Sequence, residues 1–283
     1  MLRNLSDLEG YAIAASDGIV GHVKDFLFDD EVWVIRYLVV ETDAQNSSQR
    51  VLISPYAIGQ PKWSEKVFPV SITKEQVKNS PGVDTDQPVS RQHEIRHLEY
   101  YHYPRYWGGT GLWGEGAHPK IMSPGLDSVS GEQYGDEHTR PLRVDVKAGQ
   151  GDPHLRSYQA VMPYSIHATD GDIGHAKSLL VEDETWAVRY LVVTTSNWWL
   201  GHHVLVAPQW IREVRWLDAK VLVNLTREAV KNAPPYDSWS PPIRSEEARI
   251  YQHYGRQSYW ADEVRLQNPQ YHVIATGPHQ SGC

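Results

Sequence analysis

The sequence predicts a mainly β protein with two small β-barrels in tandem, each followed by a short helix and an aromatic tail. The stretch from Tyr11 to Trp107 aligns without a gap with the stretch from Tyr164 to Trp260, at a constant offset of 153 residues. About two in five aligned residues are identical, which indicates a duplicated domain. Within each copy, short alternating segments are separated by turn residues, a pattern typical of a small, partly closed barrel.

The repeat divides the chain of 283 residues into four parts. Residues 1–107 form the first copy with its helical tail, and residues 154–276 form the second. Residues 108–153 are rich in Gly, Pro, Ser and Asp and are expected to form an irregular linker. Residues 277–283 are expected to be disordered. Part of the linker could lie against a barrel, because it contains the apolar residues Trp113, Ile121, Met122 and Leu126.

Each copy opens with a predicted hairpin. In the first copy, residues 11–15 alternate in polarity, an Asp-Gly pair follows at 17–18, and a second strand is expected over residues 20–28. Glycine adopts the positive φ of a tight turn without steric penalty, so Asp-Gly between alternating segments predicts a hairpin. The Asp-Gly pair at 170–171 predicts the same hairpin in the second copy.

The strongest strand pattern covers residues 33–40, after an acidic turn at 29–31. Successive residues of a strand point to opposite faces, and here both faces carry apolar side chains. We therefore expect a central, covered strand. Residues 51–53 and 66–71 are expected to complete a sheet of about five or six short strands.

A short helix is expected to start at Thr73, whose hydroxyl can cap the first turn while Gln76 completes a capping box. Thr226 begins the equivalent helix, but Ala229 cannot reciprocate, so the second cap is expected to be weaker. A proline follows each helix and ends it. Each copy then continues into a tail that we interpret as a second short helix with an aromatic anchor. The anchors are Tyr106 and Trp107 in the first copy and Tyr259 and Trp260 in the second.

Both copies carry the same series of short motifs, namely DG, G-x-x-G-H, an acidic turn, W-x-x-R-Y-L-V-V and a proline-led segment. The series is found at Asp17-Gly18, Gly21-His22, Trp33, residues 36–40 and Pro55, and again 153 residues later. It resembles the PRC-barrel family, which is named for the photosynthetic reaction centre and its H chain. The resemblance covers about two-thirds of the chain. It implies a small β-barrel used for protein contacts, with no shared catalytic residues.

Composition excludes several functional classes. The net charge is −8 and no run of Lys or Arg occurs, so a nucleic-acid partner is not expected. The single cysteine, Cys283, cannot form an intramolecular disulfide, and no apolar segment approaches the roughly 20 residues of a membrane helix. We expect a cytoplasmic protein without a transmembrane segment, and peripheral association with a membrane stays open.

No catalytic set occurs in both copies, so the sequence predicts a non-enzymatic protein without a cofactor. His22 and His175 are shared, but no Ser, Cys or carboxylate pair lies at a matching distance from them. His93 and His97 are four residues apart, and this spacing makes them weak candidates for a metal site. The second copy lacks both histidines, so no metal site is predicted.

The candidate interaction residues are aromatic. Trp198 and Trp199 replace polar residues of the first copy in a predicted hairpin loop. They either form an exposed contact patch or fold under the barrel. The tail anchors are the further candidates: Tyr106, Trp107, Tyr259 and Trp260.

Two functional hypotheses follow. The first is an adaptor or scaffold whose two barrels pack as a pseudo-symmetric pair and whose aromatic residues dock a protein partner of unknown identity. The second is a small-molecule or metal-binding sensor that uses a cleft between the barrels. This second hypothesis predicts a ligand-sized pocket lined by aromatic residues such as Trp63, Trp216, Tyr106 or Tyr259.

Overall fold

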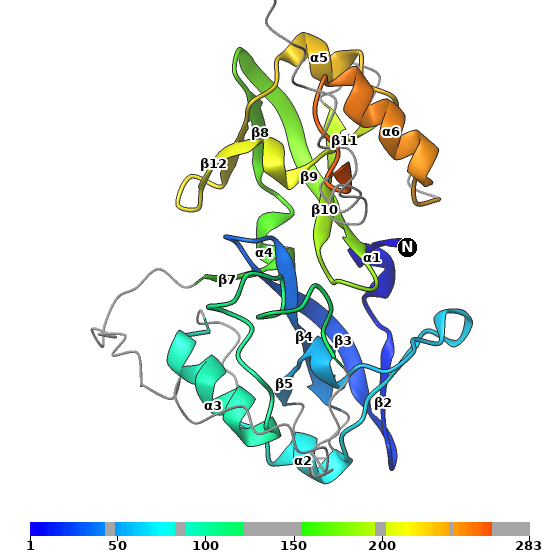
Figure 1. The fold of residues 1–283 in the computed structure, drawn as a ribbon, viewed down its shortest axis with the longest axis vertical. Coiled ribbons are helices and arrows are strands. Elements are labelled where there is room, and N and C mark those ends of the chain that lie inside the picture. The colour runs from blue at the N-terminus through cyan, green and yellow to red at the C-terminus, as the bar shows by residue number, and fades with distance from the viewer. Residues whose placement is uncertain (43–48, 83–88, 121–153, 196–201, 238–239, 262–283) are drawn as a thin grey trace, which may run out of the picture.

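The computed structural model describes residues 1–42, 49–82, 89–120, 154–195, 202–237 and 240–261. We call residues 1–120 the first half and residues 154–261 the second half. Each half holds one β-sheet, and the two sheets lie one above the other along the long axis (Figure 1). The mainly β class is confirmed. No helix among the described residues is both long and apolar enough to cross a lipid bilayer.

Among the described residues, the two halves share one order of elements, apart from a 3-10 helix found only in the first (Trp63–Glu65) and a strand found only in the second (Ile211–Arg215). The first half contains β1 (Leu2–Asn4), α1 (Leu5–Leu8), β2 (Ala12–Ala15), β3 (Gly18–Asp29), β4 (Val34–Thr42), β5 (Arg50–Ile53), η1 (Pro55–Ala57), η2 (Trp63–Glu65), β6 (Val67–Pro69), α2 (Lys74–Lys78) and α3 (Arg91–Tyr101). The second half contains β7 (Leu155–Ser157), α4 (Tyr158–Val161), β8 (Ser165–Ala168), β9 (Gly171–Glu182), β10 (Val188–Thr195), β11 (His203–Val206), η4 (Pro208–Trp210), β12 (Ile211–Arg215), β13 (Lys220–Val223), α5 (Arg227–Lys231) and α6 (Arg244–His253).

Strand order is also repeated. It is β5-β4-β3-β2-β6 in the first sheet and β11-β10-β9-β8-β13 in the second, where β12 adds one more strand beside β13. β2 is antiparallel to β3 and parallel to β6, and β8 has the same relation to β9 and β13. Within the described residues, the outermost strands of each sheet do not pair with each other, so closed barrels are not found. In the first half, the chain after β5 does approach the end of β6, where the Gly59 N–H donates to the Pro69 carbonyl (2.8 Å).

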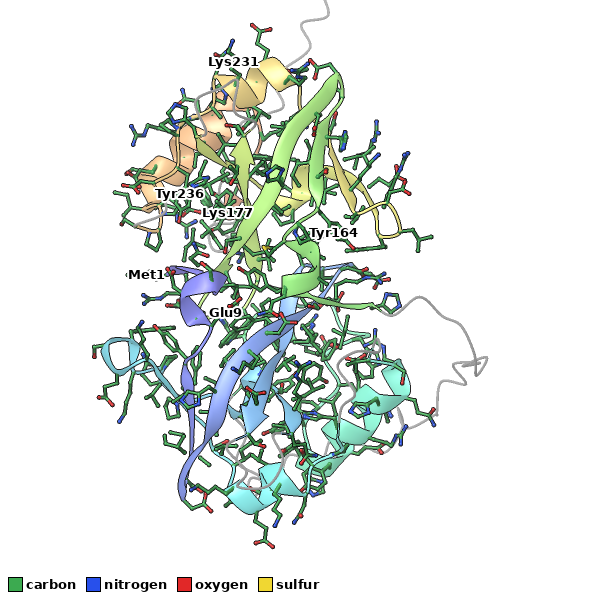
Figure 2. All side chains as sticks on the ribbon, turned by 180° about the vertical axis from the view of Figure 1, so that it is seen from behind. Met1, Glu9, Tyr164, Lys177, Lys231 and Tyr236 are labelled. Carbon is green, nitrogen blue, oxygen red and sulfur yellow. The ribbon has the colours of Figure 1, made fainter. Side chains whose placement is uncertain are left out.

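The two halves exchange their first strands. β1 precedes the first sheet in the sequence but pairs with β9 of the second sheet, and β7 pairs in return with β3 of the first. The starts of β4 and β10 are also joined: Ile35 N–H donates to the Trp186 carbonyl (2.9 Å) and Val188 N–H donates to the Trp33 carbonyl (2.7 Å). The two donors are 153 residues apart, and so are the two acceptors. Each bond is therefore the counterpart of the other, and the halves form a pseudo-symmetric pair. Figure 2 shows the first helical turn, with Glu9, at the junction between them.

The apolar core runs through both halves without interruption. Its main cluster includes buried side chains from each sheet, and aromatic rings cross the junction between the sheets. Phe26 of the first half packs edge-on against Tyr158 of the second, at 6.0 Å between ring centroids. Phe68 packs against Trp186 at the same distance. Because this core is shared, we expect each half to depend on the other for stability.

The Gly-His motif of both copies has a steric explanation. A Cβ atom added to Gly21 would lie 2.0 Å from the Glu41 carbonyl oxygen, and one added to Gly174 would lie 2.0 Å from the Thr194 carbonyl oxygen. At both places the neighbouring strand approaches so closely that only glycine fits. The repeated glycine is therefore explained by the close packing of adjacent strands in each sheet.

The helix caps agree with the sequence analysis. Thr73 accepts a hydrogen bond from the backbone N–H of Gln76, whose side chain accepts in return from the Thr73 N–H, and this completes a capping box before α2. Before α5, the Thr226 hydroxyl accepts from the Ala229 N–H without a reciprocal bond. The weaker second cap is confirmed.

Candidate functional site

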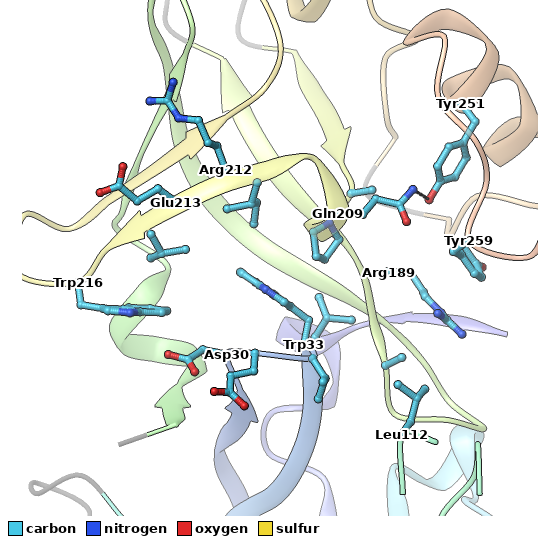
Figure 3. Close-up of a pocket in the computed structure, with 18 residues that line it drawn as sticks. Asp30, Trp33, Leu112, Arg189, Gln209, Arg212, Glu213, Trp216, Tyr251 and Tyr259 are labelled. Carbon is cyan, nitrogen blue, oxygen red and sulfur yellow. Dashed lines mark hydrogen bonds between the residues drawn. The ribbon is translucent and has the colours of Figure 1, made fainter. Parts of the chain in front are cut away.

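A cavity of about 560 Å³ opens at the junction of the two halves (Figure 3). Its size falls within the range of roughly 300–1,000 Å³ typical of ligand sites. One wall is the turn between β3 and β4 of the first half, with Val32 and Trp33. The first half also contributes Leu112, and the second half supplies the remaining walls, with Arg189 on β10, Gln209 on η4, and the tail residue Tyr259. The cavity therefore exists only because the halves are paired.

The β3–β4 turn positions the first wall. The Asp29 side chain accepts hydrogen bonds from the backbone N–H groups of Glu31 (3.1 Å) and Val32 (3.3 Å). Trp33 follows with a positive φ of 55°, a conformation that is costly for a bulky residue. Its ring stacks on Phe28, at 5.2 Å between centroids. These contacts hold the turn so that Trp33 faces the second half.

Charged residues of both signs line the cavity, and three of them form ion pairs: Asp30, Arg189 and Glu213. Glu31 and Arg212 line it as well. Arg189 forms an ion pair with Glu182 (2.5 Å), and its guanidinium lies 4.1 Å from the centroid of the Tyr259 ring. Burial opposes ionisation of Glu182, but the ion pair and hydrogen bonds outweigh it and hold the pKa of Glu182 below its ordinary value.

Ion pairs also occur at the rim of the cavity. Asp30 pairs with Arg156 (2.7 Å), and the Arg156 guanidinium lies 4.1 Å from the centroid of the Trp216 ring. Glu213 pairs with Arg215 (2.9 Å). The walls of the cavity therefore combine aromatic rings with charged residues of both signs.

The equivalent position in the first half is filled. Trp113, from the segment after the first tail, is 5% exposed and packs edge-on against Tyr56, at 5.0 Å between centroids. Its indole N–H donates to the carbonyl oxygen of Thr185 in the second half (2.8 Å). The Arg36 guanidinium lies 4.8 Å from its ring centroid. The sequence analysis named Trp113 among residues that could pack against a barrel, and the structure shows that it does.

Each half also contains a buried carboxylate. Glu94 is 2% exposed, is hydrogen-bonded by the Tyr106 hydroxyl, and pairs with Arg91 (3.2 Å). Burial raises the pKa of Glu94 to about 7, although the positive charge of Arg91 opposes this rise. Glu247 has the equivalent place and accepts from the Tyr190 hydroxyl (2.9 Å). Neither carboxylate is among the residues that line the cavity, so both belong to the packing of the tails.

The aromatic anchors pack against their own halves. Tyr106 is 3% exposed and lies in the core, so it offers no docking surface. Trp107 and Trp260 are half-buried beneath arginines, with the Arg91 and Arg244 guanidinium groups each 4.3 Å from the ring centroid below. Tyr259, the fourth anchor, is half-buried and lines the cavity. The candidates Trp198 and Trp199 lie outside the described residues.

The two histidines of α3 differ in burial, and His93 is only half-buried. His97 is fully buried, and its Nε2 atom lies 3.0 Å from the Leu52 carbonyl oxygen. Its ring packs edge-on against Tyr37. Burial lowers the pKa of His97 to about 4. No group of three or more His, Cys, Asp or Glu side chains able to hold a metal occurs in the part of the chain that the structure describes.

Sequence reasoning missed most of the cavity. Of its lining residues, it had named only Trp216 and Tyr259 as possible members of a cleft, while Trp63 and Tyr106 are not among them. It also began the repeat at Tyr11, although the exchanged strands read Leu-Arg-Asn and Leu-Arg-Ser at the same offset. The similarity of these two short segments could have shown that the repeat begins before Tyr11. The two sequences give no indication that each strand pairs with the sheet of the other half.

Comparison with known proteins adds no assignment. No protein-family model matches the chain, and no curated protein is found to be similar to it. Function must therefore be argued from the cavity and from the repeat.

Proposed function

We propose that this chain is a non-enzymatic, tandem PRC-barrel-type protein of the cytoplasm that acts as an adaptor, with the cavity as its docking site for a protein partner. The observation that carries the proposal is the open cavity at the junction of the halves. It is bounded by both copies of the repeat, and its walls combine aromatic rings with arginine. Aromatic residues and arginine are enriched where proteins bind each other.

The chemistry of the cavity supports a binding role. A general acid or base needs a titratable group that faces the substrate with a pKa near the working pH. The carboxyl group with a pKa of about 7, Glu94, is buried and bonded to Tyr106. Around the cavity, the carboxylates Asp30 and Glu213 are paired with arginines.

Site-specific crosslinking in the native host tests the adaptor function. A photoreactive residue at Glu213, exposed at the cavity rim, should capture one abundant partner. The matched control is Gln60, which is also exposed and is the counterpart of Glu213 in the first half. Capture from Glu213 and not from Gln60 would support the proposal. Equal capture from both positions, or none from either, would contradict it.

A small-molecule sensor is the second candidate function. The volume of the cavity and the presence of Trp216 and Tyr259 in its walls favour this candidate. It predicts that the melting temperature rises with a low-molecular-weight ligand, because a ligand that binds only the folded state stabilises that state. A broad panel of ligands and metals that leaves the melting temperature unchanged would count against it.

A further inference from the structure

Trp113 has four partners in the first-half site, and together they define what that site recognises. Tyr56 and Tyr106 contact the indole ring with ring centroids 5.0 and 6.3 Å away. The Arg36 guanidinium lies 4.8 Å from the ring centroid. The Thr185 carbonyl, from the second half, accepts the indole N–H (2.8 Å).

All four partners have counterparts that line the second-half cavity. At the repeat offset of 153 residues, Tyr56 corresponds to Gln209, Tyr106 to Tyr259 and Arg36 to Arg189. Thr185, which belongs to the second half, corresponds to Val32 of the first. The cavity in the second half is therefore equivalent to the site that Trp113 occupies in the first half. In the first half it is filled by the chain itself, and in the second half the described residues, which end at 261, leave it open.

One of the four positions changes its chemistry between the halves. Tyr56 is buried and narrows the first-half site, whereas its counterpart Gln209 is exposed at the cavity wall. The other wall positions keep the arginine, the tyrosine and the turn backbone. The second site therefore keeps the contacts that suit an indole ring and has more room for it.

The way Trp113 is presented points to a polypeptide ligand. The backbone next to the ring takes part, because the Leu112 carbonyl accepts a hydrogen bond from Arg36 (2.6 Å). A tight turn then closes behind the ring, where Gly111 N–H donates to the Gly114 carbonyl (2.7 Å). Gly114 supports this turn with a φ of 74°. A free indole compound would provide the ring but not these backbone contacts.

We propose that the second-half cavity binds a tryptophan side chain carried by a partner polypeptide, in the way that the first half holds Trp113. This proposal rests on the adaptor function and names the group that the adaptor recognises. The indole lies against Arg189 and Tyr259, and its N–H donates to the backbone of the β3–β4 turn at Val32.

A peptide copied from the chain itself is the direct probe. The segment 108–118, Gly-Gly-Thr-Gly-Leu-Trp-Gly-Glu-Gly-Ala-His, carries the tryptophan that fills the first site. Titration calorimetry of the full chain with this peptide should give one site per chain. The same peptide with alanine in place of tryptophan should bind at least about tenfold more weakly, since a buried tryptophan is often a dominant contact.

Two variants locate the binding site without removing core residues. Gln209→Trp places a large side chain at the exposed wall of the cavity and should abolish binding of the peptide. Gln209→Ala leaves the cavity open and should bind the peptide within about threefold of the natural chain. Unchanged binding to Gln209→Trp, or equal loss in both variants, would overturn the assignment of the cavity.

The outcomes separate this proposal from the adaptor function. If the peptide does not bind while Glu213 still captures a partner, the tryptophan assignment is wrong and the adaptor function stands. If neither occurs, both fail. If N-acetyl-L-tryptophanamide binds more tightly than the peptide, the cavity recognises a small aromatic molecule and the polypeptide assignment is overturned.

Discussion

The two halves of this chain share a fold, a strand order and a set of wall residues at one site, but they use that site differently. In the first half, Trp113 fills it and is almost completely buried. In the second half, the equivalent residues surround a cavity of about 560 Å³. Burying a tryptophan removes roughly 150–250 Å² from water and stabilises a protein by roughly 4–6 kcal/mol. The first copy thus gains stability at a position where the described residues of the second leave a cavity.

Pairing of the halves lets the two copies differ in this way. Each half supplies the other with an edge strand and with one wall of its site, since Thr185 accepts from Trp113 and Val32 lines the cavity. A lone small domain with an open cavity would be marginally stable. A shared core and a filled first site can offset the missing contacts of the second.

The largest effect is expected for Trp113→Ala. Removing a buried tryptophan should lower the free energy of unfolding by about 3–5 kcal/mol, measured by urea denaturation. Trp216→Ala, at the half-buried wall of the open cavity, should cost less than half as much. Equal losses in the two variants would remove the distinction between a filled site and an open one.

The two exchanged strands should contribute equally to the free energy of unfolding. Leu2 is 5% exposed and Leu155 is 4% exposed, and each belongs to the strand that its own half supplies to the other. Leu2→Ala and Leu155→Ala should each lower the free energy of unfolding by about 2–3 kcal/mol. A loss at one position with no change at the other would show that the exchange is not reciprocal.

His97 should give the first half a pH dependence that the second half lacks, since Ile250 occupies the equivalent position. The imidazole has a pKa of about 4 in the folded chain and about 6.5 when unfolded. At this site the unfolded chain therefore binds more protons between these values, so the part of the stability that depends on His97 is fully present above pH ~6.5 and decreases as the pH falls toward 4.

The substitution His97→Ile isolates this effect. Between pH 7 and pH 4.5, it should reduce the acid-induced loss of unfolding free energy by roughly 2–3 kcal/mol relative to the natural chain. Urea denaturation at the two pH values measures the difference. Parallel pH profiles for the two proteins would show that His97 does not titrate in this range.

The smallest effect concerns the helix caps. Ala229→Gln should complete the capping box of α5 and raise the free energy of unfolding by about 0.5 kcal/mol, whereas Gln76→Ala should remove the box of α2 and lower it by a similar amount. Thermal unfolding monitored by circular dichroism is sensitive enough for both. Changes of the same sign in the two variants would contradict the comparison of the caps.

The repeat, the hairpins, the central strand and the two caps could be predicted from the sequence, because they depend on local patterns such as Asp-Gly and Thr-x-x-Gln. The exchange of β1 and β7 could not be predicted, since an edge strand pairs equally well with either sheet by its pattern. The cavity was missed for a related reason. Val32 and Tyr259 are far apart in the chain, and only the fold brings them to one cavity.

A crystal structure of the chain bound to the peptide 108–118 tests the central claim most directly. The account predicts one peptide per chain, with its indole in the cavity beside Arg189 and Tyr259, its N–H directed at the Val32 carbonyl, and Trp113 in place in the first half. A peptide bound elsewhere, or a cavity closed by the chain's own side chains, would contradict the claim that the second half keeps open the site that the first half fills.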